Sequence, residues 1–237
     1  MKQETRIIPE ETNPKFYAEH LKPYKFLENY AKGKKVLEIG CGDGYGSAYL
    51  AKVASEVVGI DYEADIILQA KDKYNAPNLR FIEMDATNLQ FTDNLFDIAC
   101  SFQVIEHIPE EKLIKYLSEV KRVLKKGGKF FLSTLNLNHT MKSLFTYTKN
   151  SAHCKEFRLE ELKALLTSAF PTVEIYGLHL TLRHGLYQRL KKIGIFNFLP
   201  DKQNPVKRFY NKITTGDFII TPHNLQKAID FICICSI

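Results

Sequence analysis

The chain has 237 residues, is 45% hydrophobic and 25% charged, and carries a formal net charge of +6. These proportions are ordinary for a globular protein, and they exclude collagen-like, disordered and disulfide-scaffold classes. Its longest apolar runs fall far short of the roughly 18 residues that a membrane-spanning helix needs, and its first residues lack the apolar segment of a secretory signal. We therefore expect a cytoplasmic protein that folds as one domain over residues 1–237.

Five cysteines, an odd number, are spread along the chain without C-x-x-C spacing. Cys100, Cys233 and Cys235 lie in apolar, strand-like runs, which predicts buried thiols. The pattern favours a reducing compartment and argues against a structural zinc site.

The first half of the chain alternates short apolar runs with amphipathic stretches. An aromatic-rich helix is predicted over 14–31, and a helix with apolar residues at helical spacing opens at Pro109. The remaining predicted elements are strands at 36–39, 57–60, 79–82, 96–100 and 129–133, and helices at 47–53 and 64–74. Strands that alternate with helices indicate βαβ units and a parallel sheet.

The second half continues with a helix over 159–170 and a strand over 172–178, and a final strand covers 228–236. About fifty residues separate the last two strands, which is too long for a plain loop in a compact domain. An insertion with structure of its own is therefore expected there.

A run of glycines directly follows the first predicted strand. The run includes Gly40 and Gly42 and is preceded by Glu38. Glycines at a strand-to-helix turn let the backbone approach a ligand, and the following helix N-terminus offers N–H donors. Asp61 ends the second strand 21 residues after Gly40, where an acidic side chain typically accepts from ribose hydroxyls. Together these features predict a site for a nucleoside-containing ligand.

The spacing of the glycines argues against two common nucleotide sites. A dinucleotide fingerprint would place its third glycine at position 45, which is Tyr45, and the G-K-[ST] of a P-loop is absent. An acidic residue beside the loop would repel a pyrophosphate but suits a cationic amine.

The acid-x-G-x-G-x-G pattern resembles motif I of the class I S-adenosylmethionine (SAM)-dependent methyltransferases. Segments 81–86, 96–107 and 122–129 resemble later motifs of that family, and 133–136 with 153–157 is similar to its quinone, sugar and glycan-pathway branch. The resemblance implies an α/β fold with a seven-stranded, mostly parallel Rossmann-like sheet, helices on both faces and an antiparallel last strand. It also implies a lid helix at 14–31, a SAM-binding core at 34–178, an insertion at 180–227 and a final strand at 228–236.

Positions carried over from the family motifs provide the expected contacts to SAM. Glu38 and Gly40 would meet the methionyl ammonium, and Asp61 the ribose. Tyr62 would pack on the adenine, and Asp85 would accept from the adenine amino group. The full predicted set is Glu38, Gly40, Gly42, Asp61, Tyr62, Asp85, Ala86 and Gln103. Ordinary structural roles remain open for several of them, such as a helix N-cap for Asp61.

His107 follows the fourth strand, at the edge where ligands bind in such sheets. Its ordinary pKa suits proton removal near neutral pH, which makes it the candidate catalytic base. A structural histidine at the start of the next helix is an equally good interpretation. Candidate substrate contacts are Tyr17, Tyr24, His139 and His153. The histidines lack metal-ligand spacing, so no metal is predicted.

The expected function is methyl transfer from SAM to a small-molecule acceptor, with oxygen as the favoured acceptor atom. Two alternatives stay open: an RNA or protein methyltransferase, and a non-catalytic SAM-binding regulator or subunit. The chain lacks the Asn/Asp-Pro-Pro-aromatic turn of amino-base methylation and the Pro-Cys of cytosine C5 methylation, so these two reactions are disfavoured.

The positive charge is concentrated in the insertion. Residues 181–213 contain eight Lys or Arg and one acid, a local charge of +7, and five aromatic residues. One interpretation is a solvated helical cap whose apolar stripe, Leu186, Leu190 and Ile193, packs on the domain or on a second subunit. Others are a lid over an anionic or lipid-linked substrate, peripheral membrane contact and, least favoured, a nucleic-acid surface. Both a monomer and a homodimer fit the sequence.

Overall fold

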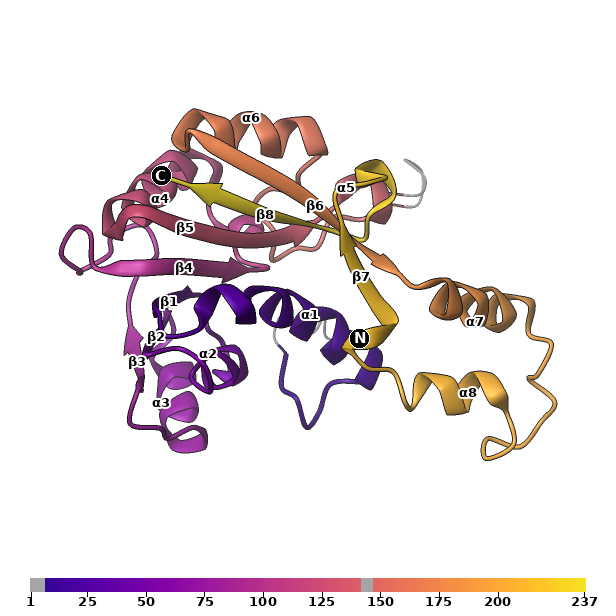
Figure 1. The fold of residues 1–237 in the computed structure, drawn as a ribbon. Helices are drawn as coiled ribbons and strands as arrows, with labels where there is room; N and C mark the ends of the chain where they lie inside the picture. Colours follow the sequence, from indigo (N-terminus) through magenta and orange to yellow (C-terminus); the bar gives the residue numbers. More distant parts are fainter. Residues whose placement is uncertain (1–6, 142–146) are drawn as a thin grey trace.

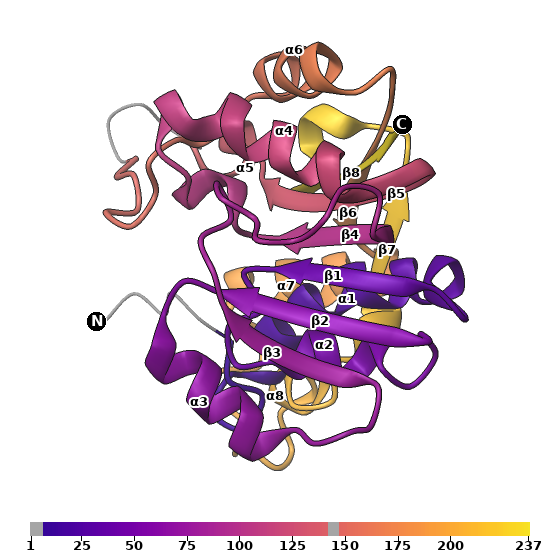
Figure 2. The ribbon, with the colours of Figure 1, turned by 90° about the vertical axis from the view of Figure 1, so that its left-hand side faces the viewer.

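The computed structural model describes residues 7–141 and 147–237, and its centre is one twisted sheet (Figure 1). Across that sheet the strand order is β3-β2-β1-β4-β5-β8-β6-β7. The strands are β1 Lys35–Ile39, β2 Glu56–Asp61, β3 Leu79–Glu83, β4 Phe96–Phe102, β5 Leu124–Leu135, β6 Thr172–Leu180, β7 Phe218–Thr221 and β8 Asp230–Ser236. Strands β3, β2, β1, β4 and β5 are parallel and run side by side (Figure 2).

Helices cover both faces of the sheet, as expected. One face carries α1, α2 and α3, whereas α4 and α6 pack on the other. The helices are α1 Pro14–Ala31, α2 Tyr45–Leu50, α3 Ala64–Lys73, α4 Leu113–Val123, α5 Leu137–Thr140, α6 Leu159–Ala169, α7 Leu182–Ile193 and α8 Pro205–Tyr210. Short 3₁₀ turns are η1 Ile105–His107, η2 Glu110–Lys112, η3 Thr215–Asp217 and η4 Leu225–Lys227.

The central strands are buried along nearly their whole length. In β1 and β2 only the first residue is partly accessible, and all the others are buried. This continuous burial is typical of parallel strands covered by helices on both faces, and it explains why their sequences are apolar runs rather than alternating patterns.

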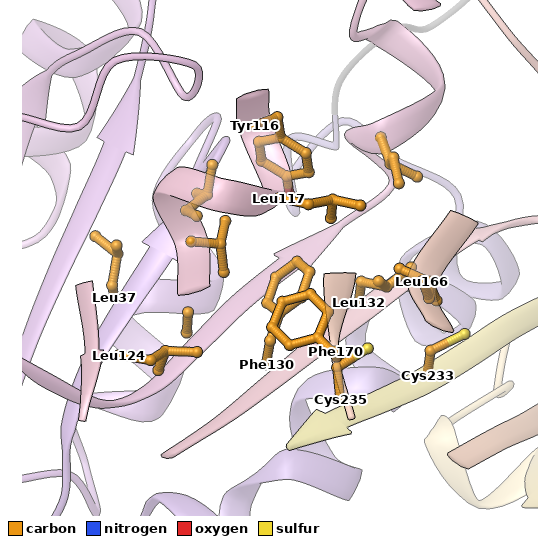
Figure 3. Close-up of a cluster of buried hydrophobic side chains, with 14 of the residues drawn as sticks. Leu37, Tyr116, Leu117, Leu124, Phe130, Leu132, Leu166, Phe170, Cys233 and Cys235 are labelled. Carbon is orange, nitrogen blue, oxygen red and sulfur yellow. The ribbon is translucent and has the colours of Figure 1, made fainter. Parts of the chain in front are cut away.

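The largest apolar cluster lies between the sheet and α4 and α6 (Figure 3). Tyr116 and Leu117 of α4 and Leu166 of α6 are fully buried there against Phe130 and Leu132 of β5. The helical spacing of apolar residues in α4 therefore marks its core-facing side. Truncation of Leu117 to alanine would cost about 2–5 kcal/mol of stability.

The expectation of seven strands is wrong by one. β7 lies inside the predicted insertion and pairs antiparallel with the outer edge of β6, with Ile220 opposite Leu178. Its four residues form a strand because the chain returns along β6 after α7 and α8, a long-range pairing that local patterns do not reveal. The last strand, β8, is antiparallel to both of its neighbours, β5 and β6, as predicted.

Two element boundaries also differ from the sequence prediction. Pro109 precedes the short turn η2, and α4 begins only at Leu113. β5 begins at Leu124, directly after α4, and runs through Gly127 and Gly128, whereas the strand was predicted to begin at 129. The pairing of Leu124 with Phe96 of β4 explains the early start, because it extends the sheet across the glycines.

The five cysteines are all free, and Cys100, Cys233 and Cys235 are fully buried, as predicted. Cys154 is exposed. Within the described residues, no helix combines the length and the apolar character needed to cross a bilayer.

Candidate active site

The glycine loop after β1 is tied to the end of β2. The N–H of Gly40 donates to the Ile60 carbonyl at 2.8 Å, and the N–H of Gly42 donates to Oδ2 of Asp61 at 3.0 Å. Oδ1 of Asp61 accepts from the N–H of Glu63 at 3.2 Å. A carboxylate offers about four acceptor positions, so Asp61 can order the loop and still accept from ribose hydroxyls.

Gly40 allows a close approach between the loop and the end of β4. Its φ of +73° lies in the left-handed region, and a Cβ there would come within 2.5 Å of the Val104 side chain. A larger residue at this position would therefore push apart the loop and the segment that carries Gln103.

Glu38 is buried under the loop and accepts two hydrogen bonds, from the hydroxyls of Tyr24 and Ser47. Burial raises its pKa from the usual 4.5 to about 7. A cationic group nearby would favour the ionised form, which suits the predicted meeting with the methionyl ammonium. Tyr24, predicted as a substrate contact, is buried, and its hydroxyl is directed to Glu38 instead of an open cavity.

The predicted adenine contacts follow β2 and β3. Tyr62, directly after β2, is 71% exposed. Oδ1 of Asp85 accepts from the N–H of Thr87 at 2.7 Å, and this hydrogen bond lowers the pKa of Asp85. Ala86 packs against the main apolar cluster. These residues therefore lie at the carboxyl edge beside the glycine loop, where adenine was expected.

Gln103 connects the end of β4 to the start of β8. It has a positive φ of 58°, and its side-chain amide donates to Ser133 at 3.3 Å and to Oδ2 of Asp230 at 3.2 Å. Burial raises the pKa of Asp230 well above its ordinary value. Asp230 was not among the predicted site residues, because nothing in the sequence near it suggests a site.

His107 lies in η1, and its ring orientation follows from one hydrogen bond. Nδ1 is 2.9 Å from the carbonyl oxygen of Ala152. A carbonyl only accepts, so Nδ1 carries the proton and Nε2 keeps a basic lone pair. The structure thus leaves His107 able to take a proton, while the hydrogen bond to Ala152 also gives it a structural role.

His153 meets His107 edge to face, with ring centroids 4.9 Å apart. Its Nδ1 donates to Glu156 at 2.6 Å, and burial together with His107 lowers the pKa of His153 to about 4. One donor atom each of Glu106, His107 and His153 lies within 4.8 Å of the others. Sequence spacing did not reveal this cluster, because the chain between 107 and 153 brings its members together only in the fold. Its polar groups have protein partners, such as Asn150 for Nε2 of His153 at 3.3 Å.

A pocket of about 450 Å³ opens between α1, α5, β6, α7 and the start of β8. Its polar lining includes Lys15, Glu19, His139, His179, Gln188, Lys227 and Asp230. The volume suits a small molecule. Nε2 of His179 is buried and has no hydrogen-bond partner within 7–141 and 147–237. Of the predicted substrate contacts, His139 lines this pocket. Tyr17, by contrast, packs edge to face on Tyr45 with ring centroids 5.6 Å apart.

Comparison with known proteins agrees with this geometry. Residues 37–132 match the family model described as a methyltransferase domain. A protein of Mycolicibacterium smegmatis named "Probable S-adenosylmethionine-dependent methyltransferase" is 32% identical over 178 residues, which cover 72% of this chain and 67% of the relative. This chain belongs to the class I SAM-dependent methyltransferases. As a member of that family it is an enzyme whose cofactor is S-adenosylmethionine.

This methyltransferase also resembles two further proteins. A fatty-acid O-methyltransferase of M. smegmatis is 37% identical over 105 residues, which cover 44% of this chain and 37% of that protein. A crystal structure of a SAM-dependent methyltransferase from Thermotoga maritima has a TM-score of 0.62 and 15% identity, and the match covers 93% of this chain and 92% of the other. The latter likeness shows the shared Rossmann-like fold.

The residues of the methyltransferase fit SAM on structural grounds. A Cβ added to Gly42 would meet nothing within 4 Å, so there is open space beside the loop. Asp61 borders that loop, and its carboxylate has acceptor positions beyond those used by the N–H groups of Gly42 and Glu63. Glu38 is buried below the loop. These features suit a ligand with a ribose and an ammonium group.

Proposed function

We propose that this enzyme transfers the methyl group of SAM to an oxygen atom of a small-molecule acceptor. The observation that carries the proposal is the pocket of about 450 Å³ bordered by Asp230, because Gln103, a predicted SAM contact, donates to that same carboxyl group. The pocket and the glycine loop therefore share one edge of the sheet. The likeness to a fatty-acid O-methyltransferase supports oxygen as the acceptor atom and a lipid-like acceptor.

In this proposal the cofactor is held by side chains from three strand ends. Glu38 would pair with the methionyl ammonium, Asp61 with the ribose hydroxyls and Asp85 with the adenine amino group. Tyr62, largely exposed, would cover one face of the adenine, and Ala86 would line its other side. When bound, SAM supplies an electrophilic methyl group on a sulfonium sulfur.

The acceptor must lose a proton if it is a hydroxyl group. Nε2 of His107 would take this proton, and the resulting imidazolium would be stabilised by the hydrogen bond from Nδ1–H to Ala152. An acceptor that is already a carboxylate needs no base, because its oxygen is nucleophilic at neutral pH. His107 should thus matter for hydroxyl acceptors and much less for fatty acids.

The test is a panel of acceptors incubated with the purified enzyme and radiolabelled SAM. The panel contains fatty acids, hydroxylated lipids, phenols and sugars, together with RNA and a protein mixture. We expect S-adenosylhomocysteine to form with at least one small molecule and the label to be recovered in a methyl ester or ether. Label recovered only in RNA or protein would contradict the proposal, as would transfer only to nitrogen or carbon.

A further inference from the structure

Residues 181–213, here called the basic arm, project from the end of the sheet as the hairpin of α7 and α8 (Figure 1). Among the described residues ten large hydrophobic side chains are exposed, and five of them lie within 182–198 of this arm. They are Leu182, Leu186, Ile193, Ile195 and Phe198, with exposed fractions between 51% and 96%. Such a concentration on one short segment marks an interaction surface.

The helix α7 directs its apolar stripe away from the protein. Leu182, Leu186 and Ile193 share one helical face by their spacing and are all exposed. The opposite face carries His184, which is fully buried, and Tyr187, whose ring stacks on Phe209 with centroids 4.2 Å apart. Of the stripe predicted to pack on the domain or on a second subunit, Leu186 and Ile193 do not pack on the domain, whereas Leu190 is half-buried. The protein-facing side is built from aromatic and polar groups, which leaves the aliphatic groups in solvent.

Basic side chains surround the exposed stripe. The arm carries a charge of +7, and its single acid, Asp201, is paired with Lys207. Arg189 and Lys192 are exposed on one side of this stripe, and Arg183 is exposed on its other side. An aliphatic stripe flanked by cations is the pattern of helices that lie in the interface of an anionic bilayer.

We propose that the basic arm docks on an anionic membrane surface. Its aliphatic stripe enters the boundary between headgroups and acyl chains, and its lysines and arginines meet the anionic headgroups. Gln188, on the protein-facing side of the same helix, lines the pocket proposed for the acceptor, so docking would leave the thickness of one helix between that pocket and the lipid. Only this last consequence rests on the proposed function.

Charge and side-chain chemistry disfavour two other binding partners for the basic arm, a second copy of the chain and single-stranded nucleic acid. A second copy docked through the same surface would bring +7 against +7, which opposes a two-fold contact. Single-stranded nucleic acid needs exposed aromatic faces for stacking. In this arm Tyr187 and Phe209 are stacked on each other and Tyr210 packs on the same cluster. Of the five exposed large hydrophobic side chains of the arm, four are aliphatic and only Phe198 is aromatic.

The test is sedimentation of the full chain with vesicles, without SAM or acceptor. Vesicles of equal parts phosphatidylglycerol and phosphatidylcholine should bind the protein, whereas pure phosphatidylcholine should bind it about tenfold less or weaker still. Leu186→Ser should weaken binding to the anionic vesicles about tenfold, because one buried leucine is lost from the bilayer contact. Replacement of both Arg189 and Lys192 by Ser should weaken it by a similar factor, and added salt should do the same.

Leu68→Ser is the matched control, because Leu68 of α3 is 59% exposed and Leu186 is 56% exposed. It should leave vesicle binding unchanged. Phe198→Ser is a second test variant, because this side chain is 79% exposed and its replacement should not disturb folding. It should weaken vesicle binding as Leu186→Ser does.

Several results would overturn the proposal. These are equal binding to both kinds of vesicle, no binding to either, or an equal loss for Leu68→Ser. A dimer seen by light scattering that Leu186→Ser dissociates would assign the surface to a second copy, and competition by RNA would assign it to nucleic acid. Vesicle binding can fail while methyl transfer to a soluble acceptor persists, so this test and that of the proposed function give separate answers.

Discussion

The hydroxyl of Tyr24, on α1, donates a hydrogen bond to the carboxylate of Glu38, the buried acid of β1 that precedes the glycine loop. The ring of Tyr24 also fills the space over Gly46, where a Cβ would come within 2.2 Å of it. The N-terminal helix is therefore joined to the cofactor loop by a polar contact and by close packing. This contact links the stability of the fold to the shape of the SAM site.

Tyr24→Phe should destabilise the protein by about 1–3 kcal/mol, because it removes a donor from a buried carboxyl group and keeps the ring. Urea unfolding at neutral pH measures the change. Tyr30→Phe is the control, because Tyr30 lies on the same helix but is 40% exposed, and its unfolding midpoint should hardly move. Equal losses in the two variants would show that the Tyr24 hydroxyl has no special role.

Glu38 should make the stability of the ligand-free protein decrease between about pH 4.5 and pH 7. Burial raises its folded-state pKa to about 7, so the protonated form stabilises the fold and this contribution is lost as pH rises through 7. The whole shift corresponds to roughly 3 kcal/mol. Burial raises the pKa of Glu106 to about 7 as well, and its effect has the same sign. Glu38→Gln should therefore reduce the difference in the free energy of unfolding between pH 5 and pH 8, as measured by urea unfolding at both values. An equal difference in the variant and the unchanged protein would refute the assignment to Glu38.

Asp61→Ala should weaken SAM binding about tenfold to a hundredfold. The variant loses the acceptor proposed for the ribose and also the hydrogen bond that holds the N–H of Gly42. Isothermal titration calorimetry with SAM measures the effect. Asp65→Ala removes an exposed acid at the start of α3 and should bind SAM like the unchanged protein. Unchanged SAM binding by Asp61→Ala would contradict the proposed role of Asp61 in holding the ribose.

His107→Ala should lower kcat about a hundredfold or more with a hydroxyl acceptor, because a positioned base contributes on this scale. The Kd for SAM should stay nearly constant. His223→Ala, at an exposed histidine, serves as the control and should leave both quantities unchanged. Full turnover of hydroxyl acceptors by His107→Ala would leave His107 with a structural role only. A lower stability of His107→Ala with unchanged kcat would indicate that His107 acts through its hydrogen bond to Ala152.

The meeting of the glycine loop with Asp61 was predictable because its signals are local. The glycines after β1 and Asp61 at the end of β2 are separated by a single helix, and parallel pairing of adjacent strands places their ends at one edge. The hydrogen bond from Gly42 to Asp61 confirms that these two positions meet.

The contacts around the pocket proposed for the acceptor were largely invisible in the sequence. Gln103 and Asp230 are 127 positions apart and meet because β8 inserts between β5 and β6. The cluster of Glu106, His107 and His153 likewise forms only when residues 150–156 fold back over η1. No periodicity or short spacing links such positions, so no local pattern identifies them.

The sequence by itself determined the class of fold, the glycine loop after β1 and the concentration of charge in 181–213, because each depends on residues close together in the chain. Only the tertiary structure decided where β7 and β8 pair, what lines the pocket proposed for the acceptor and which face of α7 meets solvent. Those outcomes depend on contacts between distant segments. Leu186 shows the difference: its helical spacing was evident, but only the packing of His184 and Tyr187 against the protein turned it outward.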